Sequence, residues 1–98
     1  MVTIGMNYFV LPGKGQIFED AVAKVVDTMG GMAGHDDSQL YKQVSDGDPT
    51  YLIVSRWNSE KDFDDFVASD AFKKVTNWGQ QNILSGRPRH TTYQETGP

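Results

Sequence analysis

The side chains that could do chemistry in this chain are few, and its two histidines come first. His35 and His90 could each act as a general base, because imidazole is the side chain that exchanges a proton near neutral pH. His90 follows Arg89 in the basic run Arg87-Pro88-Arg89-His90, which suits a small ligand that carries a carboxylate or a sulfate. His35 lies in a glycine-rich run that predicts an exposed turn. Neither histidine has a partner at metal-ligand spacing, so we predict no metal site.

Asn7 is the polar candidate near the start of the chain. It stands between Met6 and Tyr8 in a run of β-favouring residues, where asparagine is disfavoured. Its amide could donate a hydrogen bond to bound dioxygen or to a substrate oxygen. The alternative is that Asn7 is a polar residue on the less buried face of its strand.

Aromatic side chains offer surfaces on which a flat aromatic substrate could stack. Trp57 ends an apolar run, and Phe63, Phe66 and Phe72 follow it at helical spacing. Such a stripe is also typical of a plain hydrophobic core, which is the interpretation we favour for Phe63 and Phe72. Phe66 is open to both interpretations. Trp78 could form a pocket wall or cover a sheet edge.

The composition excludes several classes of function. The net charge of −4, with nine basic and 13 acidic residues, argues against a nucleic-acid partner, which needs a basic footprint. The absence of cysteine excludes disulfides, thiolate nucleophiles and cysteine metal sites. No apolar run is long enough to span a membrane, and the first residues do not resemble a secretory signal. We therefore expect a cytoplasmic protein without a membrane partner.

Hydrophobic periodicity and turn residues predict one α+β domain over residues 1–98. Ser59 and Ser69 each suit a helix N-cap, which indicates a break between two helical pieces. The order β-α-β-β-α-β is that of a ferredoxin-like fold, a four-stranded antiparallel sheet with its helices on one face. The predicted strands are 2–11, 38–45, 50–57 and 90–94, and the predicted helices are 16–29, 59–68 and 70–81.

Two of the predicted strands carry apolar residues on both faces. In the third strand, Ile53 and Trp57 alternate with Leu52 and Val54. Two helices can cover only one face of a four-stranded sheet, and an antiparallel sheet normally leaves its other face polar. We therefore expect a second subunit to pack sheet against sheet in a homodimer. The alternative is that the second apolar face lines an open ligand cleft.

The run Trp57-x-Ser59-x-x-x-Phe63-x-x-Phe66-x-x-Ser69-x-x-Phe72, together with the order of the elements, resembles the antibiotic biosynthesis monooxygenase superfamily. This resemblance covers nearly the whole chain. It implies a dimeric α+β barrel and an oxidoreductase that acts on a small aromatic ligand. The superfamily includes cofactor-free oxygenases and haem-degrading monooxygenases.

The haem-degrading branch of the superfamily uses three residues that can be compared with this chain. Asn7 matches its asparagine on the first strand. Phe66 stands where that branch has a tryptophan, and Thr76 stands where it has the histidine that binds iron. Because threonine does not replace imidazole as a haem ligand, the resemblance implies no haem bound in that way.

The resulting hypothesis is a monooxygenase that oxidises an aromatic or polycyclic molecule in a pocket between the sheet and the second helix, without a cofactor. In it, Asn7 orients the oxygen and His90 is the base. The predicted substrate-binding residues are Trp57, Phe66, Thr76, Trp78 and Arg89. Two alternatives stay open. One is a haem-binding or haem-degrading monooxygenase with a different iron ligand, and the other is a non-catalytic dimeric protein that binds a small ligand.

Overall fold

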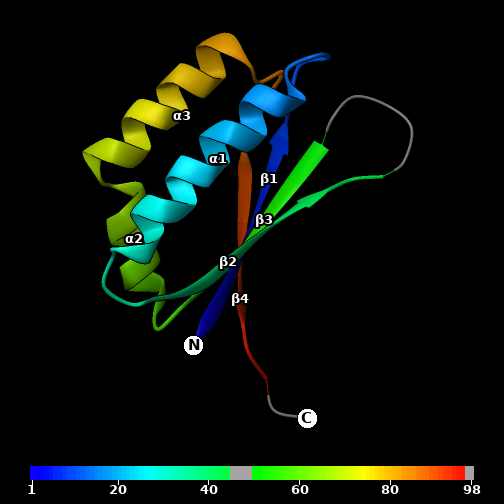
Figure 1. Cartoon of the computed structure of the whole chain (residues 1–98). Helices are drawn as coiled ribbons and strands as arrows, with labels where there is room; N and C mark the ends of the chain where they lie inside the picture. The colour runs from blue at the N-terminus through cyan, green and yellow to red at the C-terminus, as the bar shows by residue number, and fades with distance from the viewer. Residues whose placement is uncertain (45–49, 97–98) are drawn as a thin grey trace.

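The computed structural model describes residues 1–44 and 50–96. These residues form four strands and three helices, and two consecutive helices occupy the place of a single second helix (Figure 1). The α+β ferredoxin-like prediction is therefore confirmed. The strands are β1 (Val2–Phe9), β2 (His35–Lys42), β3 (Thr50–Trp57) and β4 (Arg89–Gln94), and the helices are α1 (Gly15–Gly30), α2 (Glu60–Val67) and α3 (Asp70–Asn82).

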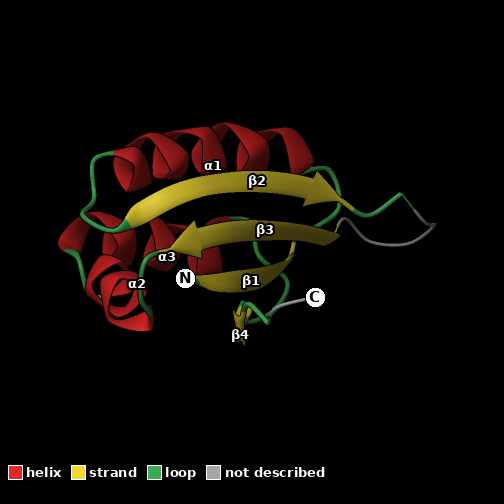
Figure 2. Cartoon of the chain, turned by 90° about the horizontal axis from the view of Figure 1, so that it is seen from below, coloured by secondary structure: helices red, strands yellow, loops and turns green. Residues whose placement is uncertain are grey.

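The strands form one antiparallel sheet in the order β2-β3-β1-β4 (Figure 2). β1 pairs with both β3 and β4, so that Met6 lies opposite Ile53 on one side and opposite His90 on the other. Successive side chains of a strand point to opposite faces. Ile4, Met6 and Tyr8 therefore share the face that the helices cover, and the residues between them share the open face.

Two serines begin the helices that follow β3, as predicted. Ser59 Oγ accepts a hydrogen bond from the backbone N–H of Asp62 at 3.3 Å and donates one to the Asp62 carboxylate at 3.0 Å. Ser69 Oγ accepts from the Phe72 N–H at 3.3 Å and donates to the Phe66 carbonyl oxygen at 2.6 Å. Each cap satisfies an N–H that the first helical turn leaves unpaired. The junction thus fixes the start of α3, which carries part of the candidate site.

The second strand begins earlier than predicted. We expected it to start at Ser38, after an exposed loop, but it starts at His35. Gly34 has a φ of 83°, a conformation that favours glycine, and it turns the chain directly into the strand. Asp36 lies at an irregularity of the ladder between His35 and Asp37. Because aspartate is disfavoured in strands, this part of the strand gave no signal in the sequence.

The other strand boundaries differ little from the predicted ones. β1 ends two residues early at Phe9, and Val10 then forms a single bridge with Leu84. β3 begins and ends as predicted. The predicted end of the second strand at Ser45 and the predicted turn at 46–49 lie outside the described residues.

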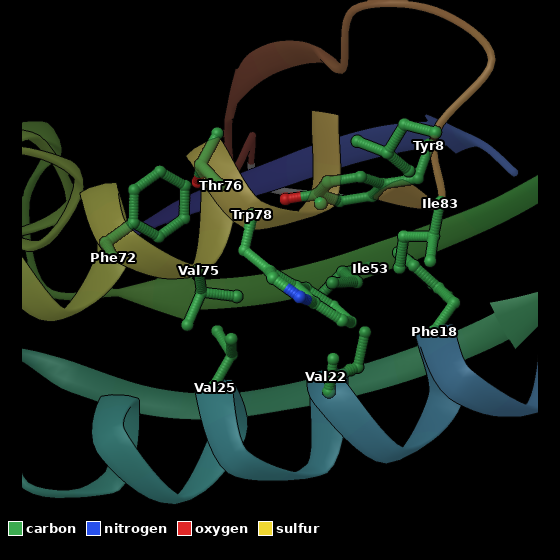
Figure 3. A pocket seen from close by; sticks show the side chains of 13 residues that line it. Tyr8, Phe18, Val22, Val25, Ile53, Phe72, Val75, Thr76, Trp78 and Ile83 are labelled. Carbon is green, nitrogen blue, oxygen red and sulfur yellow. The ribbon is translucent and has the colours of Figure 1, made fainter. Parts of the chain in front are cut away.

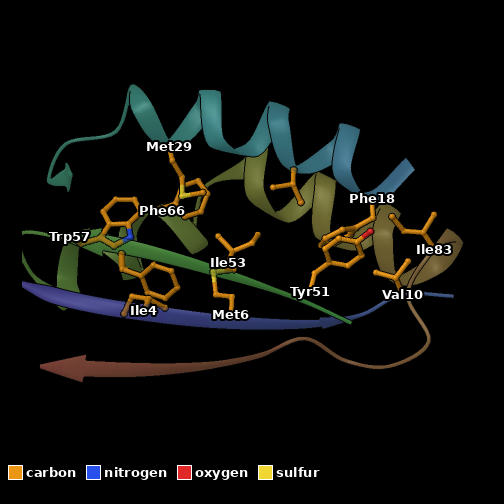
Figure 4. Packing of buried hydrophobic residues seen from close by; sticks show 12 residues of the cluster. Ile4, Met6, Val10, Phe18, Met29, Tyr51, Ile53, Trp57, Phe66 and Ile83 are labelled. Carbon is orange, nitrogen blue, oxygen red and sulfur yellow. The ribbon is translucent and has the colours of Figure 1, made fainter. Parts of the chain in front are cut away.

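The hydrophobic core lies between the sheet and the helices that cover it (Figure 4). Its largest fully buried side chains include Trp57, Phe63 and Phe66. Burying such a ring contributes roughly 1.5–3 kcal/mol. The indole nitrogen Nε1 of Trp57 donates a hydrogen bond to Ser55 Oγ at 3.0 Å, so this buried polar pair is satisfied. The prediction that Phe63 belongs to the core is confirmed.

The opposite face of the sheet carries apolar and aromatic side chains as well. Leu52 and Val54 are half-buried there, while Tyr41 and Tyr93 are 53% and 58% exposed. Leu52 and Tyr93 both approach the strand at Gly5, which has no side chain to separate them. The two apolar faces expected from the sequence are therefore present.

Among the described residues, no helix has the length and apolar character needed to cross a membrane.

Candidate active site

A cavity lies between the covered face of the sheet and helices α1 and α3 (Figure 3). It has a volume of about 40 Å³, and most of its wall is aliphatic or aromatic. A volume of roughly 10–15 Å³ holds one water molecule, and ligand pockets usually measure roughly 300–1,000 Å³. A ring therefore enters this cavity only if part of its wall moves. The lining side chains are those of Tyr8, Phe18, Ala21, Val22, Val25, Ile53, Phe72, Val75, Thr76, Trp78, Ile83 and Leu84, with Gly79 beside them.

Two hydroxyl groups are the main polar features of this cavity. Tyr8 lies on the covered face of β1, and its hydroxyl points into the cavity from the side opposite α1 (Figure 3). Thr76 of α3 contributes the second hydroxyl. Burial raises the pKa of Tyr8 well above its ordinary value, so the phenol stays protonated near neutral pH. A protonated phenol in an apolar cavity can donate a hydrogen bond to an oxygen that gains negative charge.

An outer cleft of about 190 Å³ adjoins this cavity. Tyr8, Phe72 and Thr76 line both spaces, so the two share a wall. The cleft adds the β4 residues Arg89 and His90 to its lining. The His90 ring is exposed on one side and lies 5.7 Å from the Phe63 ring, measured between centroids. His90, a possible base, thus stands at the outer end of an apolar cavity, whereas the register pairs Arg89 with Asn7 and so directs its side chain to the open face.

The structure brings together four of the seven predicted site residues. Thr76 and Trp78 line the interior cavity, and Thr76 also lines the outer cleft with Arg89 and His90. These residues come from α3 and from β4, which is the neighbour of β1 in the sheet. Their roles in binding and catalysis stay predictions.

Trp57 and Phe66 do not take the positions predicted for substrate-binding residues. Trp57 is fully buried, and Phe66 is 1% exposed; their ring centroids lie 5.6 Å apart. Neither side chain lines the interior cavity or the outer cleft. The physical reason is that both rings pack in the core where α2 meets β3, and the only described cavity beside Phe66 is a separate space of about 60 Å³ between α1 and α3.

Asn7 also lies away from the cavity. It is an exposed residue of β1 and pairs with Leu52 and Arg89, so its side chain belongs to the open face of the sheet. There it lines a separate cleft with Tyr41 and Thr50. Its position between Met6 and Tyr8 explains this, because neighbours on a strand point to opposite faces. The prediction that Asn7 faces the pocket beside the second helix is corrected, and its catalytic role stays untested.

Tyr8 is the candidate that the sequence reasoning missed. The signal was present, since strand alternation puts Tyr8 on the same face as Ile4 and Met6. A hydroxyl on that face must meet a partner, water or a cavity. No hydrogen bond joins the Tyr8 hydroxyl to another of the described residues, and it is not fully enclosed. It is therefore available to a ligand.

His35 is not the exposed turn residue that the sequence predicted. It is half-buried at the start of β2, with its ring centroid 5.0 Å from that of Trp57. Its Nε2 lies 2.8 Å from Ser38 Oγ, and Ser38 in turn contacts the sulfur of Met29. These contacts tie β2 to α1 and give His35 a structural role. Within residues 1–44 and 50–96, no group of three acidic or histidine side chains could hold a metal ion.

Comparison with known families gives one match over most of the chain. The family model described as antibiotic biosynthesis monooxygenase matches residues 1–78. Two curated relatives, both named "Putative heme-binding protein", come from Haloarcula marismortui and Halobacterium salinarum. They are 39% and 34% identical over 92 and 88 residues. The match covers 90% of this chain but only 13% and 18% of the two relatives, which are far longer proteins.

Solved structures share the fold at low sequence identity. A conserved protein from Methanosarcina mazei has a TM-score of 0.85 at 18% identity, covering 97% of this chain and 92% of that one. SnoaB from Streptomyces nogalater, described as a cofactor-independent oxygenase, has a TM-score of 0.82 at 18% identity, with coverage of 99% and 94%. These likenesses establish the fold.

Proposed function

Because the chain belongs to the antibiotic biosynthesis monooxygenase family, we propose that it is a monooxygenase that oxidises an aromatic or polycyclic molecule between the sheet and α3, without a cofactor. The observation that carries this proposal is the cavity itself. Apolar walls surround the hydroxyls of Tyr8 and Thr76, and His90 stands at the adjoining cleft. When part of the wall moves to admit a flat ring, these hydroxyls can donate hydrogen bonds to the oxygen atoms attached to the ring.

The reaction takes its electrons from the substrate. An activated CH₂ group beside a phenol or ketone loses a proton to a base, and the carbanion gives one electron to dioxygen. The resulting superoxide and carbon radical join as a hydroperoxide. Loss of water then breaks the O–O bond and leaves a carbonyl group. The sum is R–CH₂–R′ + O₂ → R–CO–R′ + H₂O, which needs no outside reductant.

Each residue in this scheme has a role that follows from its position. Tyr8 donates a hydrogen bond to the substrate oxygen on which negative charge collects after deprotonation, and Thr76 supports it from α3. His90 removes the proton from the side of the outer cleft. Phe72, which lines both spaces, stacks against the ring. Asn7 has no part at this cavity, because its side chain belongs to the other face of the sheet.

The interior cavity does not fit haem. Its side-chain donors are two hydroxyls and the indole N–H of Trp78, and its lining includes no imidazole, thiolate or thioether. The hydroxyl of Tyr8 could bind iron only as phenolate, and burial opposes that form. We therefore derive no step through haem.

An oxygen-uptake assay tests the proposal. The purified chain is incubated with a panel of hydroxylated anthrones, which carry the CH₂ group that the reaction needs, and the expected result is uptake with one carbonyl formed for each dioxygen consumed. Mass spectrometry with ¹⁸O₂ should place one labelled atom in the product. If the folded protein accelerates no member of a broad panel, the proposal fails and the non-catalytic ligand-binding alternative takes its place.

Haem binding is the second candidate, favoured by the names of the long relatives and by His90 in the outer cleft. Haemin titration separates it from the first candidate. Binding through His90 would shift the Soret band at micromolar haemin, and His90→Ala would abolish the shift. We expect an unchanged spectrum, because the interior donors do not suit iron.

The open face of the sheet supports a homodimer as part of the proposal. Tyr41, Leu52, Val54 and Tyr93 give this face an apolar surface that no helix covers. A second copy packed on it would bury these side chains without blocking the cavity on the other face. Each subunit would then carry its own site.

A further inference from the structure

A groove on the outer surface of α1 and α3 adjoins the interior cavity. It has a volume of about 440 Å³, within the range of ligand pockets. Ala21, Val75 and Trp78 line both this groove and the interior cavity, so these three side chains form the partition between them. The remaining groove residues are Ile17, Asp20, Lys24 and Lys74.

Trp78 is the part of this partition that can move. Its side chain is 42% exposed, and in Figure 3 the indole extends from α3 across the mouth of the cavity toward α1. Among the described residues, no ring contact and no hydrogen bond holds the indole. The Trp78 carbonyl accepts a hydrogen bond from the side-chain amide of Asn82, and this bond involves the backbone of Trp78 rather than its indole. A rotation of the indole therefore breaks no specific interaction.

The charges around the groove favour an anionic ligand. Lys24 of α1 and Lys74 of α3 stand on its two sides, and neither forms an ion pair within the described part of the chain. Asp20 is the opposing charge in the lining, and its carboxylate accepts a hydrogen bond from Gln16 at 3.0 Å. The exposed side chain of Ile17 adds apolar surface beside these charges. The groove thus combines two available cations with a surface for a ring.

We propose that the substrate is an aromatic carboxylate that enters between α1 and α3, displaces the Trp78 indole with its ring and binds Lys24 and Lys74 with its carboxylate. This inference rests on the proposed function, because it concerns the same cavity. Displacement of the indole joins the interior space of about 40 Å³ to the groove of about 440 Å³. The ring then reaches Tyr8 and Thr76 while the anionic group stays at the surface, where its hydration is kept.

A matched pair of ligands tests the charge requirement. The probes are 1,4-dihydroxy-2-naphthoate and its methyl ester, measured by equilibrium binding under nitrogen so that no turnover occurs. The acid should bind about fivefold more tightly than the ester, since exposed ion pairs contribute modest energies. The variant Lys24→Gln/Lys74→Gln should remove this preference. The control Lys14→Gln/Lys73→Gln makes the same change in net charge outside the groove and should keep it.

Trp78→Ala tests the movable partition. Removing the indole should raise the association rate constant of the acid about tenfold in stopped-flow measurements, because binding no longer waits for a rearrangement. Trp78→Phe, which keeps a ring and perturbs folding less, should give an intermediate rate. Equal rates for the three proteins would overturn the proposed entry route.

Arg89 of β4 provides the rival partner for the carboxylate. Loss of the acid preference in Arg89→Gln, with the preference kept in the double lysine variant, would overturn the inference. Oxygen uptake with equal kcat/KM for an anthrone carboxylate and its methyl ester would also overturn it while leaving the monooxygenase proposal intact. A lysine-dependent preference in binding without any oxygen uptake would support the inference and count against the monooxygenase.

Discussion

The pair of Trp57 and Ser55 provides a test of where the core ends and the site begins. Both residues are fully buried, and the indole N–H donates to the serine hydroxyl at 3.0 Å. Ser55→Ala leaves that N–H buried without an acceptor, which costs about 1–3 kcal/mol of unfolding free energy. For a domain of this size, a loss of 2 kcal/mol corresponds to a fall in Tm of roughly 8–16 °C.

Trp57→Phe should be more destabilising than Ser55→Ala. It leaves the serine hydroxyl unpaired, and the smaller ring also leaves a cavity between Phe63, Phe66 and His35, whose rings surround the indole. The double variant removes both polar partners. Its cost should therefore be less than the sum of the single costs by about 1 kcal/mol or more.

Urea unfolding monitored by circular dichroism measures these free energies, with Ser85→Ala, an exposed serine, as the control. The folded fraction of Trp57→Phe should keep its full oxygen uptake per molecule, because Trp57 lines neither the cavity nor the cleft. A loss below about 0.5 kcal/mol in Ser55→Ala would refute the buried hydrogen bond. A selective loss of turnover in stable Trp57→Phe would refute the assignment of Trp57 to the core.

Three further predictions concern backbone strain, pH and assembly. Gly34→Ala should lower the free energy of unfolding in urea by more than about 1 kcal/mol, because Gly34 has a φ of 83° and a Cβ would overlap the Asp62 carboxyl. Gly30→Ala should not, because the added Cβ has open space around it. Burial and a hydrogen bond to the Glu19 carboxylate raise the pKa of Tyr51 to about 12. The free energy of unfolding should therefore keep its full contribution from Tyr51 below about pH 10 and fall as the pH rises toward 12. Tyr51→Phe should remove this fall in the free energy of unfolding at high pH, and an unchanged pH dependence would contradict the raised pKa of Tyr51. Leu52→Asp should convert a dimer to monomers in analytical ultracentrifugation, and a dimer that persists would contradict packing through the open face.

The fold could be predicted from the sequence because its signals are local. Ser59 and Ser69 fit the two N-caps, and their spacing predicts both helices after β3. The start of β2 could not be predicted, since it depends on the positive φ of Gly34 and on an irregularity at Asp36. Neither leaves a pattern in hydrophobic periodicity.

The positions of the candidate site residues were predicted in part, and two separate reasons explain the differences. Thr76 and Trp78 line the cavity as expected, because their helix was placed well. The family resemblance predicts a role for Asn7, whereas alternation along the same strand places Tyr8, and not Asn7, on the covered face. Which aromatic residue becomes core depends on how α2 packs against β3, and sequence spacing does not determine that, as Phe66 shows.

The proposed mechanism depends most directly on the Tyr8 hydroxyl as the hydrogen-bond donor in the cavity. The decisive measurement is kcat/KM for oxygen uptake by Tyr8→Phe, compared with Tyr93→Phe, which removes an exposed hydroxyl on the other face of the sheet. We predict a fall of about 10²-fold for Tyr8→Phe, the usual effect of losing one donor to a developing oxyanion, and an unchanged value for Tyr93→Phe. Equal activity of the folded Tyr8→Phe variant and the unmodified chain would contradict the account.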